Sequence, residues 1–135
     1  MEDCLFCKII NKEIPSTQVY EDDTVYAFLD IHPVNPGHVL IAPKKHSTNL
    51  MDIEDADMEA VIRLSKKIAQ ALTAQGAAGI NLEMNNGQVA GQVIPHTHLH
   101  VVPRTESDGL KHWPGKEYAP GEAEAVAEGI RKNLQ

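Results

Sequence analysis

The chain has 135 residues, 42% of them hydrophobic, and this size allows one compact domain but leaves no room for a second. Its formal net charge of -7, with acidic and basic residues interspersed, would repel a long polyanion, so no nucleic-acid partner is expected, whereas a single small phosphate ligand is compatible. The first residues lack a secretory signal and no apolar segment approaches the roughly 20 residues of a membrane span, so we expect a cytoplasmic protein without a membrane partner.

The first part of the chain predicts a short helix followed by strands. Apolar residues between Cys4 and Asn11 indicate one or two helical turns, which Pro15 ends. Two β-rich runs, 18–21 and 24–29, then predict a hairpin across an Asp-Asp turn. Residues 38–42 predict a third strand, because Asn-Pro-Gly precedes them and a proline follows.

From Asp52 the apolar period becomes helical. Asp52 is the expected N-cap of a long helix, and Gly76 is its expected C-terminal stop. The apolar positions at helical spacing are Met58, Val61, Ile62, Ile68, Ala69 and Leu72. The remaining segments read as a strand (79–84), a glycine-bearing loop (85–92), a strand (96–102), an irregular arm (104–120) and a helix (122–134). This order predicts an α+β domain with an antiparallel sheet.

Three histidines alternate in the predicted last strand. In an extended chain His96, His98 and His100 would line one face, with Thr97, Leu99 and Val101 on the other. A single histidine on a strand is more often a satisfied structural residue, but three in register favour chemistry. One zinc ion held by all three is disfavoured, because about 3.3 Å of rise per residue places His96 and His100 roughly 13 Å apart. We therefore expect the three rings to have different roles.

The run His96-Thr97-His98-Leu99-His100-Val101-Val102 resembles the signature of the histidine triad (HIT) family. Further matching segments, spread over residues 4–104, are Phe6, Lys8-Ile9-Ile10, Glu13-Ile14-Pro15, Ala27-Phe28-Leu29-Asp30-Ile31, Pro36-Gly37-His38 and Pro43-Lys44-Lys45-His46. The resemblance implies a HIT-like fold, a five-stranded antiparallel sheet with one long helix and short N- and C-terminal helices. It implies one HIT domain over 1–135, with a core at 4–104 and a C-terminal arm and helix at 105–135.

The resemblance also implies an activity, a nucleotide hydrolase or transferase that cleaves at the α-phosphate. His98 stands at the position that the family uses as nucleophile, forming a nucleotidyl-histidine, and a neutral imidazole suits this role near pH 7. His100 and His38 stand at helper positions. In the loop before the triad, Asn85, Gly91, Gln92 and Val93 match residues that contact phosphate. A glycine-bearing loop read alone is more often only a turn.

Other matching positions imply a purine nucleotide site. Asp30 follows an apolar strand, and the aligned family carboxylate accepts the ribose hydroxyls. Phe6, Ile9, Phe28 and Ile31 resemble the family's apolar clamp around the base, although ordinary core residues would look the same. Such a clamp stacks on any base and does not separate adenine from guanine.

Cys4 and Cys7 have the spacing of metal ligands, but one pair does not complete a tetrahedral site. Some family members complete it with two histidines, here His46 and His96, which implies a structural zinc and leaves His98 free. Two buried reduced cysteines are the alternative. The family's chemistry itself requires no metal.

Three functions are thus open: a nucleotidyl hydrolase, a nucleotide-binding sensor without turnover, and a metal-buffering protein. We favour the enzyme because each expected catalytic residue is present. Its substrate is open, since Gln92 and Val102-Pro103-Arg104 resemble the dinucleoside polyphosphate branch, whereas Trp113-Pro114-Gly115 resembles the phosphoramidase branch. Family members usually form homodimers, so a second copy of the chain is the expected protein partner.

Overall fold

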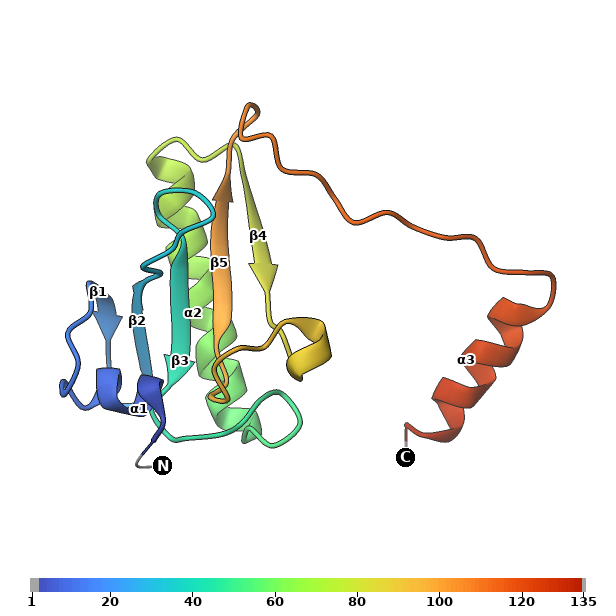
Figure 1. Ribbon diagram of the computed structural model, residues 1–135, viewed down its shortest axis with the longest axis horizontal. Helices are drawn as coiled ribbons and strands as arrows, with labels where there is room; N and C mark the ends of the chain where they lie inside the picture. Colours follow the sequence, from blue (N-terminus) through green and yellow to red (C-terminus); the bar gives the residue numbers. More distant parts are fainter. Residues whose placement is uncertain (1–2, 135) are drawn as a thin grey trace.

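A computed structural model describes residues 3–134 as a five-stranded antiparallel sheet with helices beside it (Figure 1). The elements in chain order are α1 (Leu5–Ile10), β1 (Gln18–Glu21), β2 (Val25–Leu29), β3 (Val39–Pro43), α2 (Asp55–Ala74), β4 (Gly79–Glu83), a short 3-10 helix (Gln88–Ala90), β5 (Leu99–Arg104) and α3 (Glu122–Lys132). The strand order is β1-β2-β3-β5-β4, so β4 is an edge. The predicted fold class is confirmed. Residues 1, 2 and 135 of the predicted domain lie outside the described residues.

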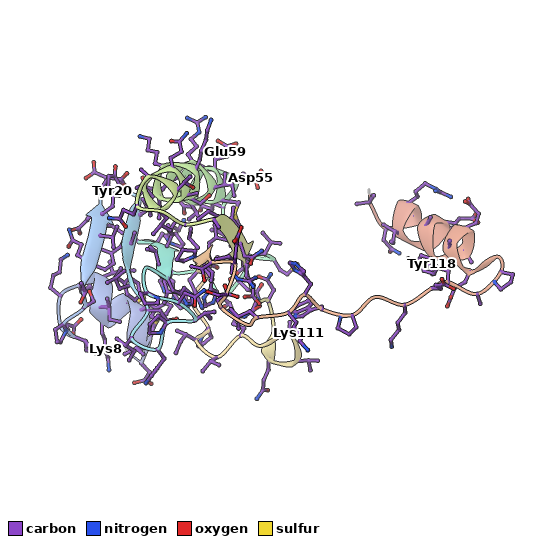
Figure 2. All side chains as sticks on the ribbon, turned by 90° about the horizontal axis from the view of Figure 1, so that it is seen from above. Lys8, Tyr20, Asp55, Glu59, Lys111 and Tyr118 are labelled. Atoms are coloured by element: carbon purple, nitrogen blue, oxygen red, sulfur yellow. The ribbon has the colours of Figure 1, made fainter. Side chains whose placement is uncertain are left out.

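The two faces of the sheet bury different side chains, as the period of two along a strand requires. One face packs on α2 through Val25, Ala27, Val39, Ile41, Leu99 and Val101. The other packs on α1 through Tyr26, Phe28, Leu40 and Ala42. Figure 2 shows Lys8 of α1 and Glu59 of α2 on opposite sides of the sheet. His100 pairs with Leu40 in the register, which places it on the α1 face, opposite the long helix.

The long helix begins later than its sequence suggested. Its N-cap is Glu54, and the prediction of Asp52 as N-cap is wrong. The Asp52 carboxylate instead accepts bonds from the backbone N–H groups of Thr48 and Asn49, both at 2.9 Å, and so closes the loop before α2. The same side-chain chemistry that caps a helix serves here in a loop. The predicted stop at Gly76 is confirmed, because this residue has a φ of +108° just past the helix end.

Gly37, directly before His38, has a φ of +98° and is closely surrounded. A Cβ at this position would lie 3.1 Å from Leu72 Cδ2 and 3.3 Å from Pro103 Cγ. We expect Gly37→Ala to lower the free energy of unfolding by about 1–3 kcal/mol, from backbone strain and crowding together. Gly76→Ala is the matched control, because its φ is similar but nothing lies within 4 Å of its Cβ position. If denaturant unfolding showed an equal loss in the free energy of unfolding for both variants, crowding at Gly37 would not contribute.

The C-terminal arm leaves the sheet through an anchored turn. Arg104 donates to both carboxylate oxygens of Asp108, from Nε to Oδ2 at 2.7 Å and from Nη2 to Oδ1 at 3.0 Å. Asn35 Nδ2 also donates to Asp108 Oδ2, at 3.1 Å. Beyond this turn the arm extends away and α3 stands apart from the sheet, with no buried residue (Figure 1). No helix within residues 3–134 has the length and apolar character needed to cross a membrane.

Candidate functional site

His98 lies just before β5 rather than in it. The predicted strand 96–102 is wrong at its start, because β5 begins at Leu99. The backbone bends at His96, whose Nε2 donates to the Pro43 carbonyl and whose Nδ1 faces Cys4 and Cys7. His98 is buried, and its Nδ1 lies 2.7 Å from the His96 carbonyl oxygen. A carbonyl only accepts, so Nδ1 carries the proton and Nε2 keeps a free electron pair.

The His98 ring is held between two other rings. Phe6 packs edge-on against it with ring centroids 4.9 Å apart, and the His100 ring lies at 5.0 Å. Burial lowers the pKa of His98, and the nearby His100 lowers it further, while the bond to the His96 carbonyl opposes both effects. A neutral imidazole with an unprotonated nitrogen is what a nucleophile requires.

His38 and His100 form a second histidine pair whose protons can be assigned. The backbone N–H of Val34 donates to His38 Nδ1 at 3.0 Å, so the neutral His38 ring carries its proton on Nε2. His38 Nε2 lies 2.9 Å from His100 Nδ1 and therefore donates to it. His100 then carries its own proton on Nε2. This relay leaves an N–H donor on His100 on the face it shares with His98.

A carboxylate lies beside each of these two histidines. Asp30 Oδ2 lies 3.7 Å from His38 Nε2, and Asp30 Oδ1 accepts the backbone N–H of His32 at 2.8 Å. Glu83 pairs with His100 across the β4–β5 register. Burial lowers the pKa of His38 and of His100, and the negative charges of Asp30 and Glu83 partly offset that effect on both rings.

Cys4, Cys7, His46 and His96 form a group of four potential metal ligands, whose ligand atoms all lie within 4.8 Å of one another. Cys4 Sγ lies 3.3 Å from His96 Nδ1, and Cys7 Sγ lies 3.5 Å from both His46 Nδ1 and His96 Nδ1. The two Nδ1 atoms are 3.2 Å apart. The backbone carbonyl of Pro43 accepts from His96 Nε2 at 2.8 Å, so the Nδ1 of the neutral ring presents its electron pair to the group.

These distances fit a tetrahedral ion. Zinc bonds of about 2.0–2.1 Å to nitrogen and about 2.3 Å to sulfur place two ligand nitrogens roughly 3.3 Å apart, and a nitrogen and a sulfur roughly 3.5 Å apart. Burial, together with the neighbouring Cys4, raises the pKa of the Cys7 thiol to about 11. Burial lowers the pKa of His96 to about 4. Cys7 and His96 are therefore uncharged without a cation, and a bound cation would displace the Cys7 thiol proton.

The residues expected to hold the base are only partly gathered. Phe6, Ile9 and Phe28 are buried in one cluster on the α1 face, and the Phe6 and Phe28 rings meet edge-on at 5.3 Å. Ile31 does not join this cluster, because its side chain is 85% exposed. Phe6 links the cluster to His98, so an apolar wall adjoins the nucleophile.

The loop before the triad is shaped by the side chain of Gln92. Its Oε1 accepts the Gly87 N–H at 2.9 Å, and its Nε2 donates to the carbonyls of Thr48 and Ile94 at 2.6 and 3.0 Å. Gly91 has a φ of +99°, and a Cβ there would make an ordinary van der Waals contact with Asn85 Nδ2 at 3.5 Å. Val93 follows with an exposed side chain. The four expected phosphate-contacting residues thus occupy one loop of defined shape.

A groove of about 510 Å³ lies along the β4–β5 edge. Glu83 and Val102 line it from the sheet, and Lys111, His112 and Trp113 line it from the arm. Val102 follows His100 by two residues in β5, so the groove lies on the triad face of the sheet. It offers space for a group attached to a ligand at His98.

Four groups that contact the site residues were not among the residues predicted from the sequence. They are the Val34 N–H and Glu83, which act on the His38–His100 pair, and Ser47 and Thr97, whose hydroxyls lie 2.6 Å apart in the interior. The position of Thr97 between two triad histidines was the only local signal, because the triad signature places hydrophobic residues there.

Comparisons with known proteins identify relatives of the chain. The HIT domain model matches residues 11–107. An adenosine 5′-monophosphoramidase of Schizosaccharomyces pombe is 34% identical, with 98% of each chain covered. The crystal structure of a HIT family protein from Bacillus subtilis is 38% identical with a TM-score of 0.90, covering 98% of each chain. A zinc-bound histidine triad family protein from Mycobacterium smegmatis is 31% identical with a TM-score of 0.78, covering 97% of this chain and 98% of that one.

Proposed function

Because the chain belongs to the HIT domain family, we propose that it is a nucleotide hydrolase that cleaves at the α-phosphate of purine nucleotide derivatives through a nucleotidyl-His98 intermediate. The bond between His98 Nδ1 and the His96 carbonyl carries the proposal, because it fixes the free electron pair on Nε2. The adenosine 5′-monophosphoramidase name of a relative that matches nearly the whole chain supports the same class of reaction.

In the first step His98 Nε2 attacks the α-phosphorus. A nitrogen–phosphorus bond forms, the bond to the leaving group breaks, and the leaving group departs with the bonding electrons. The N–H on His100 Nε2 would protonate that group as the bond to phosphorus breaks. In the second step water attacks the same phosphorus, His98 is released, and the water proton restores His100.

The nucleotide would lie across the α1 face. Phe6, Ile9 and Phe28 form the wall for the base, with Ile31 at its exposed margin, and the free oxygen lone pairs of Asp30 accept the ribose hydroxyls. The phosphate would lie at the loop of Asn85, Gly91, Gln92 and Val93. The N–H groups of Gly91 and Gln92 donate to the Gln88 and Gly87 carbonyls within this loop, so the Val93 N–H is the backbone donor that would face the anion. The leaving group would enter the groove between β4–β5 and the arm.

The test is a steady-state comparison on one preparation with an adenosine phosphoramidate, its guanosine analogue, diadenosine polyphosphates and an adenylated amino acid. We expect turnover of at least the phosphoramidate, with the nucleoside monophosphate as product. Tight binding of AMP without turnover of any substrate would instead identify a purine-nucleotide-binding sensor.

Acid should inactivate the enzyme through the His38–His100 pair. The pKa values of both rings lie below 6.5, chiefly through burial, and the groups facing them are Asp30, Glu83 and His98. The unfolded chain takes up these protons near pH 6.5, so the pair stabilises the fold above that pH and loses this contribution as pH falls. We expect kcat/KM to be constant near pH 7 and to decline only below pH 6.5. A midpoint above 6.5, or a pKa of His100 above 6.5 by NMR titration, would contradict the relay.

We propose zinc as the ion of the Cys4–Cys7–His46–His96 group. Two thiolates and two imidazoles at tetrahedral spacing favour it, and so does the zinc in the Mycobacterium smegmatis relative. All four positions are filled by protein, which leaves no place for a substrate, so the ion would be structural. It would join α1 and its N-cap Cys4 to His46 after β3 and to His96 at the start of the triad segment.

We further propose that the chain forms a homodimer. β4 is an open edge, and a groove of about 550 Å³ between α2 and β4 is lined by Ile62, Ala69, Ile80 and Leu82. Ile62 and Leu82 are each 46% exposed, which a second copy would cover. Sedimentation equilibrium at micromolar concentration should give twice the chain mass, and a monomer mass would contradict the proposal.

A further inference from the structure

The segment that carries the proposed nucleophile lies outside the β-ladder, so the sheet alone does not fix it. The register pairs of β5 begin at Leu99 on the β3 side and at His100 on the β4 side. His98 precedes both. The proposed reaction requires His98 Nε2 to be positioned accurately against the phosphorus. A misplacement of about 1 Å costs on the order of 100-fold in rate. Other contacts must therefore hold residues 96–98.

Ser47 and Thr97 hold this segment at two points, and we call this pair of contacts the Ser47–Thr97 clasp. The Thr97 N–H donates to the Ser47 carbonyl at 2.9 Å. The two hydroxyl oxygens lie 2.6 Å apart. Both residues are buried, Thr97 with 1% exposure and Ser47 with 6%. One of the two buried hydroxyls donates to the other, and this contact fixes the two side chains relative to each other.

The clasp lies within the short stretch that orients the His98 ring. Thr97 stands between the His96 carbonyl, which accepts the His98 Nδ1–H, and the backbone that carries His98. A rotation about Thr97 would therefore move the acceptor and the ring relative to each other. A valine would fill almost the same volume, so packing alone does not explain a hydroxyl here.

The clasp also joins the same two segments as the proposed metal group. Ser47 follows His46 directly, and Thr97 follows His96 directly. The His46 and His96 rings meet in the metal group, while the two following residues meet through their hydroxyls. The hydroxyl contact needs no ion, so the triad segment stays attached to residues 43–47 whether or not metal is bound.

We infer that Ser47 and Thr97 are positioning residues that keep His98 Nε2 aimed at the α-phosphorus. The inference rests on the proposed function and deepens it. Both side chains are buried and would act through His98 rather than by contact with the substrate. It places part of the catalytic power of this chain in a buried hydroxyl pair that sequence signatures of the triad do not include.

Thr97→Val is the direct test, because it removes the hydroxyl and keeps the β-branched shape. We expect kcat for an adenosine phosphoramidate to fall about tenfold while KM changes less than about twofold, because binding is retained and alignment is lost. Thr97→Ser, which keeps the hydroxyl, should restore most of kcat. Thr73→Val is the matched control, since Thr73 is exposed on α2 and its hydroxyl donates to the Ala69 carbonyl. An unchanged kcat in Thr97→Val, or an equal loss in Thr97→Ser, would overturn the inference.

A double-mutant cycle tests whether the two hydroxyls act as a unit. We expect Ser47→Ala to lower kcat as Thr97→Val does, and the double variant to lose no more than either single variant. Losses in kcat that multiply would show two independent effects and would overturn the clasp. Melting temperatures measured in parallel separate a general loss of stability from a loss of alignment.

A spectroscopic readout keeps the inference testable apart from turnover. Nitrogen-15 NMR of the histidine rings should show His98 as the Nδ1–H tautomer in the parent and a tautomer mixture in Thr97→Val. Identical His98 signals in both proteins would overturn the positioning role. A parent that hydrolyses no substrate would refute the proposed function instead, and the NMR comparison would still decide the clasp.

Discussion

His98→Ala should abolish turnover, lowering kcat by about 10⁴-fold or more, because no other described side chain is placed to replace its attack on phosphorus. Removal of a nucleophile eliminates the covalent step, whereas loss of a helper only slows it. The measurement is release of the nucleoside monophosphate from an adenosine phosphoramidate under saturating substrate. AMP binding should survive within about tenfold, since Phe6, Asp30 and the phosphate loop are intact.

His32→Ala is the matched control for that variant. His32 is exposed, and only its backbone N–H contacts the site, through Asp30 Oδ1. The His32→Ala variant should hydrolyse the phosphoramidate at close to the parental rate. If His98→Ala retained a tenth of the parental kcat in the absence of contaminating activity, a direct attack by water would explain the chemistry better than a covalent intermediate.

Removal of the proposed zinc should have the largest effect on stability. When the free zinc concentration is about 1,000 times the Kd, binding adds about 4 kcal/mol to the free energy of unfolding. For a chain of this length that corresponds to a change in Tm on the order of 10 °C. We expect purified protein to contain one zinc per chain and to lose that much Tm in a strong chelator. Cys7→Ser, which keeps the side-chain size and removes a thiolate, should contain less zinc and should melt at the same temperature with and without chelator.

Two results would refute the structural zinc. Parent protein that contains no zinc, and whose Tm does not respond to chelator, would leave Cys4 and Cys7 as thiols. More than one tightly held metal per chain, lost on His98 or His100 substitution, would support the metal-buffering alternative. The chelator experiment also bears on the clasp, because His98 should keep its tautomer when the ion is removed.

The sheet and the long helix could be predicted because their hydrophobic periods are local. The continuous apolar runs of β2 and β3 and the helical spacing through Val61 and Ile68 each lie within one element. The start of β5 could not be predicted in this way. His96 and His98 continue the alternation of a strand, but the bonds of His96 to Pro43 and to the cysteine group bend the chain before Leu99.

In the site, too, some contacts could be predicted from the sequence and others could not. A resemblance named Cys4, Cys7, His46 and His96 as one metal group, and the structure brings these four together. The Ser47–Thr97 contact joins residues 50 positions apart, and a hydroxyl pair leaves no local pattern in a sequence. Ile31 stays a prediction as part of the wall for the base, and its side chain, 85% exposed, stands apart from the buried cluster of Phe6, Ile9 and Phe28. Long-range polar contacts are the part that required coordinates.

The stereochemical course at phosphorus tests the covalent mechanism most directly. Each displacement at phosphorus inverts its configuration, so attack by His98 followed by attack by water gives net retention. We expect retention when a chiral adenosine thiophosphoramidate is hydrolysed in isotopically labelled water and the product configuration is determined. Net inversion would mean a single attack by water, and it would contradict the nucleotidyl-histidine and with it the role of His98 as nucleophile.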